Sequence, residues 1–388
     1  MHLFHQVQFR AFFLFEIYIY TIDFIFIQSI IYITSKLKDV DDVKKIAIIG
    51  ATGYGGAELA RILQQHPEVA IHSFHSSSQQ GKKMADSYPH LHDLVGGALR
   101  EIAIHEIAAE ADVVFLATPS GVSSKLAPEL LACDVKVIDL SGDFRIKDRQ
   151  LYEQWYKKEA PESDWLNEAV YGLTEWLDED IANKKFISNP GCYPTAALLG
   201  LAPLVKYERI DVNTIIIDAK SGVSGAGRTA SAATHFSEVN ENLKIYKVNE
   251  HQHIPEIEQM LNRWNENVGP ITFSTHLIPM TRGIMATIYA TAASETNIDE
   301  LFELYYESYK DDYFVRIREK GTYPSTKEVY GSNFCDISLA YDERTNRIMV
   351  ISVIDNLVKG AAGQAVQNMN RMLGFDERTG LDFVPMYP

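Results

Sequence analysis

A glycine-rich loop constrains the fold of this chain more than any other part of its sequence. The loop follows a short apolar run at residues 45–49, which is typical of a buried parallel strand. It precedes residues 57–65, whose apolar side chains recur on one face of a helix. Glycines placed in this way let the backbone approach a pyrophosphate at the helix N-terminus, so the pattern predicts a dinucleotide site rather than a turn that binds nothing. The residues predicted to bind the cofactor are Gly50, Thr52, Gly53, Tyr54, Gly55 and Gly56.

The segment after the second predicted strand, residues 69–74, indicates which dinucleotide binds. NAD sites commonly end this strand with an acidic residue that binds the ribose 2′-hydroxyl. This chain has serines and lysines there, and these suit a 2′-phosphate that a carboxylate would repel. We therefore predict NADP(H) as the cofactor, in contact with Ser76, Ser77 and Lys82. The alternative is a polar, solvated loop.

Strands and helices alternate through the first half of the chain, as in a parallel α/β domain. The apolar run within residues 111–117 predicts a strand that brings a Thr-Pro-Ser-Gly loop to the carboxyl edge of the sheet. Ligands bind at that edge in doubly wound folds, so Thr118 and Pro119 are predicted cofactor contacts. Residues 135–140 predict a further strand, which ends in Ser-Gly-Asp-Phe-Arg.

A cysteine lies in a turn that leads into a predicted helix, within Ser-Asn-Pro-Gly-Cys-Tyr-Pro-Thr at residues 188–195. Asn-Pro-Gly favours a tight turn, and Pro194 suits the first turn of a helix. Cys192 should therefore lie at a helix N-terminus, where free N–H groups and the helix dipole favour the thiolate. Such a thiolate can attack a carbonyl carbon, although a buried structural cysteine is the alternative. Cys133 and Cys335 lie beside apolar runs and are expected in the core.

Two histidines alternate just before a proline that opens a predicted helix. As a strand, His251 and His253 would share one face, and one of them could take the proton from Cys192 and return it. A surface pair of histidines is one alternative. A metal site with Glu250 and Glu256 is another, but no third strong ligand lies nearby in sequence, so we predict no metal.

The second half of the chain predicts a mixed α+β domain. A strand at residues 214–218 leads into a Gly/Ser loop, residues 219–228, whose N–H groups and arginine could bind an anionic group. A flexible hinge is the alternative for this loop. Further predicted strands occupy residues 273–277, 283–292, 315–317, 334–340 and 347–354, and predicted helices occupy residues 302–309 and 355–372.

Charge and cysteine content limit the partners. The formal net charge is −16 over 388 residues, which argues against nucleic acid, and an anionic substrate would need local arginines. Three cysteines without metal-type spacing suit a reducing cytoplasm, where we expect the protein.

The first 43 residues differ in composition from the rest of the chain. Residues 11–33 are long and apolar enough for a membrane helix, but Glu16, Asp23 and Gln28 interrupt them. This segment has three alternative interpretations: a membrane anchor, a poorly ordered apolar extension, or an upstream stretch outside the working protein. We do not predict membrane association.

Several motifs together resemble the N-acetyl-γ-glutamyl-phosphate reductase family. They occupy residues 50–56, 188–195, 221–228, 251–257 and 276–283, and the resemblance runs from residue 44 to the end. It implies a Rossmann NADP domain, residues 44–191 plus 356–388, and a glyceraldehyde-3-phosphate-dehydrogenase-like catalytic domain, residues 192–355. It also implies a C-terminal helix that packs back on the Rossmann domain, and assembly into a homodimer or homotetramer.

The resemblance further implies reduction of an acyl phosphate to an aldehyde with NADPH. Cys192 matches the nucleophile and one histidine matches the base, with His251 preferred to His253. The Cys192 thiolate would displace phosphate to give a thioester, and hydride transfer would follow. The remaining residues assigned in this way are Arg145, Arg228 and Arg282 for the anionic groups of the substrate, Asn189 for the substrate or the nicotinamide, and Ser224, Gly225 and Asn356 for the nicotinamide.

Three other functions fit parts of the sequence. Aspartate-semialdehyde dehydrogenase uses the same thioester logic, although the Gly-Cys-Tyr-Pro-Thr setting and the His-Leu-Ile-Pro-Met-Thr-Arg loop favour the glutamyl enzyme. A redox-sensing, NADP-binding regulator would leave Cys192 without a catalytic role. A membrane-tethered scaffold would depend only on residues 11–33.

Overall fold

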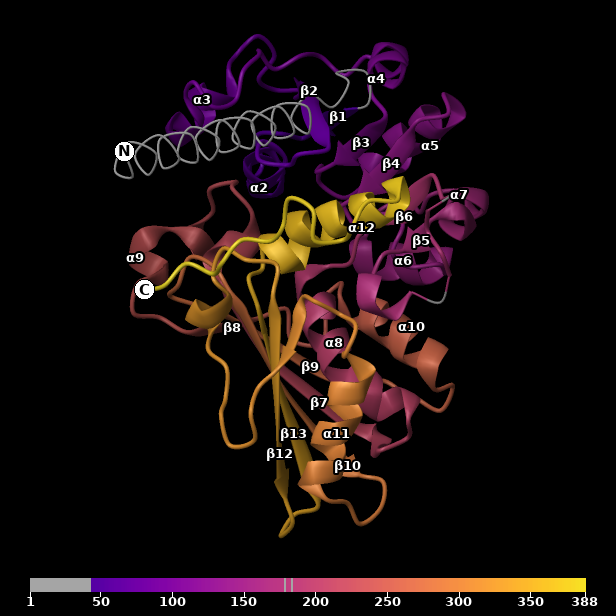
Figure 1. The fold of residues 1–388 in the computed structure, drawn as a ribbon, viewed down its shortest axis with the longest axis vertical. Helices are drawn as coiled ribbons and strands as arrows, with labels where there is room; N and C mark the ends of the chain where they lie inside the picture. Colours follow the sequence, from indigo (N-terminus) through magenta and orange to yellow (C-terminus); the bar gives the residue numbers. More distant parts are fainter. Residues whose placement is uncertain (1–42, 178, 183) are drawn as a thin grey trace, which may run out of the picture. The chain divides into compact units, whose positions relative to one another are not determined.

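Two β-sheets organise the part of the chain that the structure describes (Figure 1). The structure is a computed structural model and describes residues 43–177, 179–182 and 184–388. The apolar extension expected at residues 1–43, and with it the question of a membrane anchor, lies outside these residues except for Val43. Within the described ranges, no helix combines the length and apolarity that a bilayer crossing requires.

The first sheet has six strands, all parallel, in the order β2-β1-β3-β4-β6-β5. Side chains of β1 alternate between two buried clusters, with Ile46 and Ile48 on one face and Ala47 and Ile49 on the other. Burial on both faces explains the continuous apolar run in the sequence. The strands are β1 (Lys44–Ile49), β2 (Val69–His75), β3 (Val113–Leu116), β4 (Lys136–Asp139), β5 (Val170–Tyr171) and β6 (Phe186–Ser188).

The strand order reverses between β1 and β3, and in open parallel sheets the ligand crevice opens at that point. The predicted Rossmann topology is therefore confirmed. The helices that accompany this sheet are α2 (Tyr54–Leu63), α3 (Met84–Ser87), α4 (Ile104–Glu110), α5 (Ser123–Ala132), α6 (Arg149–Tyr156) and α7 (Ser163–Glu168), with the short 3₁₀ turns η2 (Pro89–Leu91) and η3 (Thr174–Trp176).

The second sheet has seven strands of mixed direction in the order β11-β12-β13-β10-β7-β9-β8. One face is buried under α8, α10 and α11, which lie on the same side of the strands in Figure 1. Along β10, Ile284, Ala286, Ile288 and Ala290 point into this core and alternate with half-buried residues. The strands are β7 (Ile210–Gly222), β8 (Lys244–Tyr246), β9 (Thr272–Ile278), β10 (Ile284–Ala292), β11 (Val315–Ile317), β12 (Cys335–Asp342) and β13 (Arg347–Ile354). The helices are α8 (Cys192–Lys206), α9 (Phe236–Val239), α10 (Ile254–Trp264) and α11 (Ile298–Ser308), with 3₁₀ turns η4 (Val223–Ala226), η5 (Ala232–Thr234) and η6 (Thr326–Val329).

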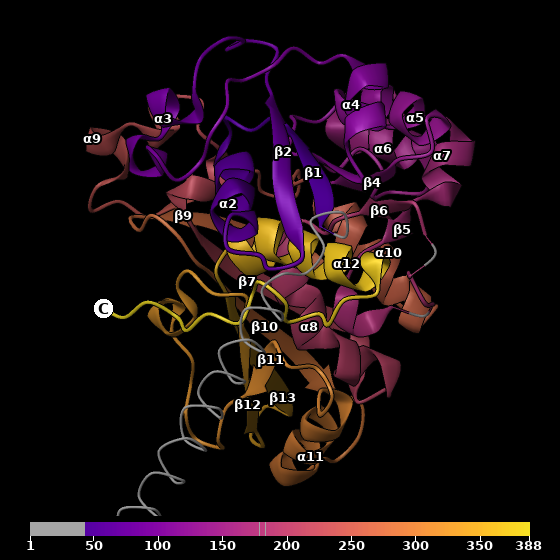
Figure 2. The same cartoon turned by 45° about the horizontal axis from the view of Figure 1, so that its top comes forward.

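The end of the chain returns to the first sheet. The π-helical turn η7 (Val358–Ala362) leads from β13 into α12 (Gly363–Leu373). Apolar residues of α12 join the cluster formed by β1 and α2, and Figure 2 shows the two helices side by side. The C-terminal helix thus packs on the Rossmann sheet, as the family resemblance implies.

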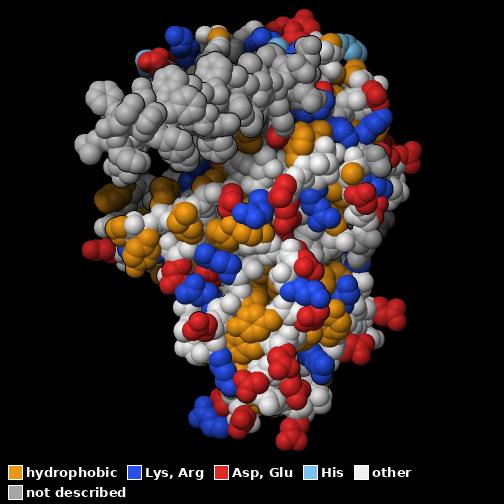
Figure 3. All heavy atoms as spheres, in the orientation of Figure 1, with side chains coloured by type: hydrophobic (Ala, Val, Ile, Leu, Met, Phe, Trp, Pro, Cys, Tyr) orange, Lys and Arg blue, Asp and Glu red, His pale blue; other side chains and the backbone are white. Residues whose placement is uncertain are grey.

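Acidic and basic side chains are interspersed on the face seen in Figure 3. The three cysteines are free. Cys335 is fully buried as expected, but the prediction for Cys133 was wrong, because it ends α5 and is only half-buried.

Candidate active site

The predicted position of Cys192 is confirmed. It is the first residue of α8, and the preceding Gly191 caps this helix with an extended backbone. The Gly191 N–H donates to the Glu256 carboxylate at 2.8 Å, and the Thr195 hydroxyl donates back to the Gly191 carbonyl at 2.9 Å. The turn that carries the thiol is therefore held from both sides.

The turn η7 packs directly against the cysteine. A Cβ added to Gly360 would lie 2.8 Å from the Cys192 Cβ, a distance that real side chains do not tolerate. Asn189, assigned from the sequence to substrate or nicotinamide, donates from Nδ2 to the Ala361 carbonyl at 3.1 Å and accepts at Oδ1 from Asn368. Asn189 thus joins the cysteine turn to α12, and its role in substrate binding stays a prediction.

The expectation of a stabilised thiolate is wrong for this structure. Burial raises the pKa of the Cys192 thiol to about 11, although the positive charge of Arg145 and backbone N–H groups lower it. The helix terminus alone does not overcome the loss of water around the sulfur. The group is a thiol at neutral pH, so its reaction needs a proton acceptor.

The two histidines lie on a turn and not on the strand that we expected. His253 caps α10, and its N–H donates to His251 Nδ1 at 3.2 Å, which brings the ring centroids to 4.7 Å. Both rings pack edge-on against Tyr193, the residue after Cys192. The proline after this turn explains the difference, because it begins the helix and ends any extended segment.

His253 approaches the residue that precedes the cysteine. A Cβ on Gly191 would be 2.5 Å from His253 Nε2. Its Nδ1 has no hydrogen-bond partner among the described residues. Burial lowers the pKa of His251 to about 3 and that of His253 well below its usual range, so both rings are neutral at pH 7.

A buried charge pair lies beneath this turn. Arg145 donates from Nε to the Asn189 carbonyl at 2.7 Å, and its Nη1 lies 3.5 Å from Glu256 Oε2. Glu256 also accepts from the Tyr171 hydroxyl at 2.8 Å. Burial raises the pKa of the Glu256 carboxyl, and Arg145 opposes that shift.

Sequence reasoning placed Glu256 only in a possible metal site. Among the described residues, no group of three His, Cys, Asp or Glu side chains could hold a metal ion. Its position three residues after His253, in the first turn of a helix, was the one signal of a structural role.

The glycine loop has the geometry that dinucleotide binding requires. Gly50 has φ of +85°, and a Cβ there would clash with the Ala117 carbonyl at the end of β3. The structure thus brings the loop after β1 beside Ala117 and Thr118, and cofactor contact by Thr118 and Pro119 stays a prediction. Tyr54 begins α2 after Gly53, so the loop N–H groups lie at a helix N-terminus. Ser76 follows β2 and is buried, whereas Ser77 and Lys82 are exposed.

The loop after β7 meets the segment after β13. Asn356 donates from Nδ2 to the Ser224 hydroxyl at 2.9 Å and accepts the Gly283 N–H at 2.7 Å. Gly225 follows on the same short 3₁₀ turn. Three residues assigned to the nicotinamide therefore lie together.

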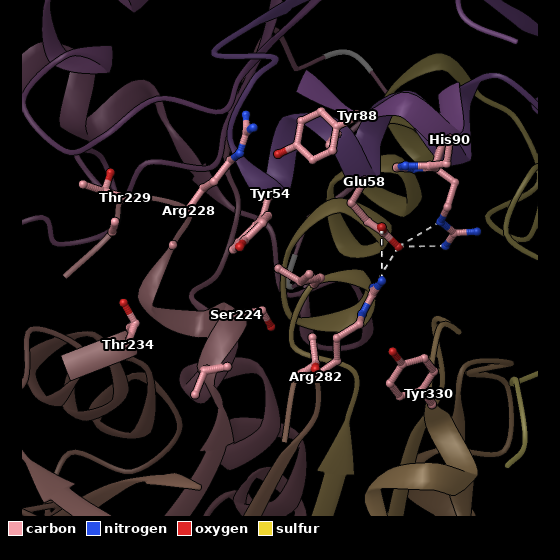
Figure 4. A pocket seen from close by; sticks show the side chains of 17 residues that line it. Tyr54, Glu58, Tyr88, His90, Ser224, Arg228, Thr229, Thr234, Arg282 and Tyr330 are labelled. Atoms are coloured by element: carbon pink, nitrogen blue, oxygen red, sulfur yellow. Dashed lines mark hydrogen bonds and ion pairs between the residues drawn. The ribbon is translucent and has the colours of Figure 1, made fainter. Parts of the chain in front are cut away.

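Arg228 and Arg282 lie on a cavity of 570 Å³, whose lining includes Tyr54 and Ser224 (Figure 4). Arg228 donates to the Thr52 carbonyl at 3.0 Å, and its guanidinium stacks over a tyrosine ring of the first domain. Arg228 thus contacts both the glycine loop and this tyrosine of the first domain.

Arg282 makes ion pairs with Glu58 at 2.8 Å and Asp355 at 3.0 Å. Figure 4 shows Glu58 reaching towards it from α2. Sequence reasoning missed both carboxylates, and the substrate roles of the arginines stay predictions.

Two family models match the chain. One, described as "Semialdehyde dehydrogenase, NAD binding domain", covers residues 45–184, and the other, "Semialdehyde dehydrogenase, dimerisation domain", covers residues 192–356. N-acetyl-gamma-glutamyl-phosphate reductase of Geobacillus sp. strain WCH70 is 65% identical over 88% of this chain and 99% of its own. The enzyme of the same name from Geobacillus thermodenitrificans is 62% identical over 89% of this chain and 100% of its own.

Solved structures share the fold at low identity. Aspartate semialdehyde dehydrogenase II of Vibrio cholerae superposes with a TM-score of 0.64 at 18% identity, covering 86% of this chain and 98% of that one. Aspartate semialdehyde dehydrogenase of Candida albicans, solved with NADP, gives 0.59 at 16% identity, with the same two coverages. The predicted two-part fold is therefore confirmed.

Proposed function

Because the chain belongs to the N-acetyl-γ-glutamyl-phosphate reductase family, we propose that it performs the family's reaction through a thioester on Cys192. The reaction reduces N-acetyl-γ-glutamyl phosphate to N-acetylglutamate 5-semialdehyde and phosphate with NADPH, a step of arginine biosynthesis. The observation that carries the mechanism is the placement of Cys192 at the start of α8, with His253 against the preceding residue.

Proton transfer comes first, because burial keeps Cys192 protonated. We propose His253 as the acceptor and thereby reverse the preference for His251. His251 Nδ1 already accepts the His253 N–H, so in the neutral ring its proton lies on Nε2. His253 is neutral and turns its Nε2 towards the cysteine turn, since a Gly191 Cβ would lie 2.5 Å from that atom.

The sulfur then attacks the acyl carbon. A C–S bond forms as the C–O bond to phosphate breaks, which leaves a thioester and free phosphate. Bound NADPH supplies the hydride that reduces this thioester. The C–S bond of the resulting thiohemiacetal then breaks to release the aldehyde, and the sulfur recovers its proton from His253. Glu256 stabilises the turn throughout through the Gly191 N–H.

The glycine loop fits the cofactor, because Gly50 lets the loop lie against the end of β3 and the loop leads into the N-terminus of α2. We propose that Ser76, Ser77 and Lys82 bind the 2′-phosphate and that Asn356 orients the nicotinamide amide through its link to Ser224. Arg145 is the proposed cation nearest the cysteine turn, since a Gly191 Cβ would be 2.9 Å from its Nη1.

The protein acts on a small molecule and forms oligomers through the region that matches the dimerisation model, residues 192–356. We propose a homodimer or homotetramer in the cytoplasm. The face of the seven-stranded sheet opposite α8, α10 and α11 supports this, because Ile216 and Tyr289 are not fully buried there.

The test is a coupled assay in the reverse direction, with N-acetylglutamate semialdehyde, phosphate and NADP⁺. The purified protein should form NADPH, and Cys192→Ser should abolish the activity. Turnover of the serine variant near the wild-type rate would remove Cys192 from the mechanism. Aspartate semialdehyde in place of the substrate tests the rival enzyme and should give little NADPH.

A further inference from the structure

The turn η7 is an unusual element at the back of the thiol. Its N–H groups reach five residues back, from Gly360 to the Asp355 carbonyl at 3.0 Å and from Ala362 to the Leu357 carbonyl at 2.9 Å. Such π-turns are rare in proteins, and many of those that are known lie at functional sites. Here the turn presents the bare Cα of Gly360 to Cys192.

The residue before Gly360 is a lysine with no access to water. The Lys359 side chain is 0% exposed and forms an ion pair with Glu175, whose side chain is 1% exposed. Lys359 Nζ also donates to Gln367 Oε1 at 2.7 Å, and Gln367 Nε2 donates to the same Glu175 carboxylate at 3.1 Å. The ion pair thus connects η7 with η3, a segment 184 residues away in sequence.

This pair is poorly explained by stability alone. Two buried charges lose their hydration, and apolar residues of similar size are often at least as stable in their place. Glu175 Oε2 has no hydrogen-bond partner within the described ranges, so the compensation is incomplete. A costly pair next to the reactive group is better explained by what it holds in place.

We propose that Lys359 is a positioning residue for the reaction. Its ion pair with Glu175 fixes the turn η7. The fixed turn holds Gly360 against Cys192 and so keeps the sulfur in line with the acyl carbon. Lys359 does not touch the reacting atoms. The inference rests on the proposed role of Cys192 and adds to it a role for the buried ion pair that holds η7.

The test compares two variants with the wild-type enzyme. Glu175→Gln keeps the size and an acceptor for Lys359 but removes the carboxylate charge. Lys359→Met/Glu175→Met removes both charges, so it leaves no buried charge unpaired. In each, kcat should fall roughly ten- to a hundredfold with KM unchanged, since a misplacement of the reacting groups by up to about 1 Å has effects of this size. Alkylation of Cys192 by iodoacetamide, followed by mass spectrometry of its peptide, should become faster as the turn loosens.

An exposed pair provides the matched control. Lys320 and Asp299 lie 2.5 Å apart with side chains 54% and 62% exposed, so Lys320→Met/Asp299→Met should behave as wild type. Wild-type kcat and alkylation in the folded Lys359→Met/Glu175→Met enzyme would overturn the proposal, and so would failure of both test variants to fold. An active Cys192→Ser enzyme would instead refute the proposed function.

Discussion

Replacing Gly360 by alanine tests whether the close approach of η7 sets the position of the thiol. The added Cβ would lie 2.8 Å from the Cys192 Cβ and 3.2 Å from its Cα. Carbon atoms in contact are normally ~3.5–4.0 Å apart, so the two segments must separate by about 0.7–1.2 Å at the closer contact. Overpacking of this kind costs about 1–3 kcal/mol, which a domain of ordinary stability survives.

The kinetic effect should exceed the effect on stability. A displacement of about 1 Å between reacting groups costs roughly a hundredfold in rate, so kcat of Gly360→Ala should fall by that order while the protein stays folded. The assay is NADPH formation from the semialdehyde, with thermal unfolding measured on the same samples. Gly96→Ala is the control, because a Cβ there meets nothing within 4 Å. A folded Gly360→Ala enzyme with wild-type kcat would refute the idea that this contact positions the sulfur.

Three further predictions follow from the charges in the site. His253→Asn should lower kcat by roughly a hundredfold or more, as expected for loss of a general base, and His251→Asn should lower it less; equal losses would contradict the assignment. Because burial raises the pKa of Cys192 to about 11, its alkylation in the enzyme without ligands should rise about tenfold per pH unit from pH 7 to 10, and a plateau near pH 7 would disprove this. Burial raises the pKa of the Glu58 carboxyl, but Arg282 outweighs burial and the pKa lies below its usual range. The charge of Glu58 therefore stabilises the fold at neutral pH, and this stabilisation is lost as the pH falls through the pKa of the folded state. Glu58→Gln should therefore unfold at lower denaturant than wild type at pH 7, with a smaller difference at pH 3.

The sequence predicted the glycine loop and the cysteine turn because each of these elements depends on a few adjacent residues. The glycine loop followed from a strand, a turn and a helix in succession, and the place of Cys192 followed from Asn-Pro-Gly and a nearby proline. Backbone preferences of this kind act over one turn of chain, so the sequence carries them directly.

Contacts between distant segments could not be predicted in this way. The Gly191–Glu256 hydrogen bond spans 65 residues, the Glu175–Lys359 pair 184 and the Glu58–Arg282 pair 224. Each requires the path of the whole chain, which the two sheets define. The arginines expected to face the substrate show the consequence, because Arg282 is engaged by carboxylates of this chain that no local pattern indicates.

The state of the thiol illustrates how such long-range burial changes the chemistry. From the helix terminus alone, Cys192 should be a reactive thiolate, and a redox sensor would then be a reasonable alternative. Burial raises the pKa of Cys192 to about 11, so the thiol form dominates at pH 7 and little thiolate is present for oxidants to attack. A sensor needs the opposite, a thiol with a low pKa. In the proposed mechanism, Cys192 is protonated in the free enzyme and gives up its proton to a neighbouring imidazole as it attacks the bound acyl group. Its nucleophilicity therefore appears only together with the substrate.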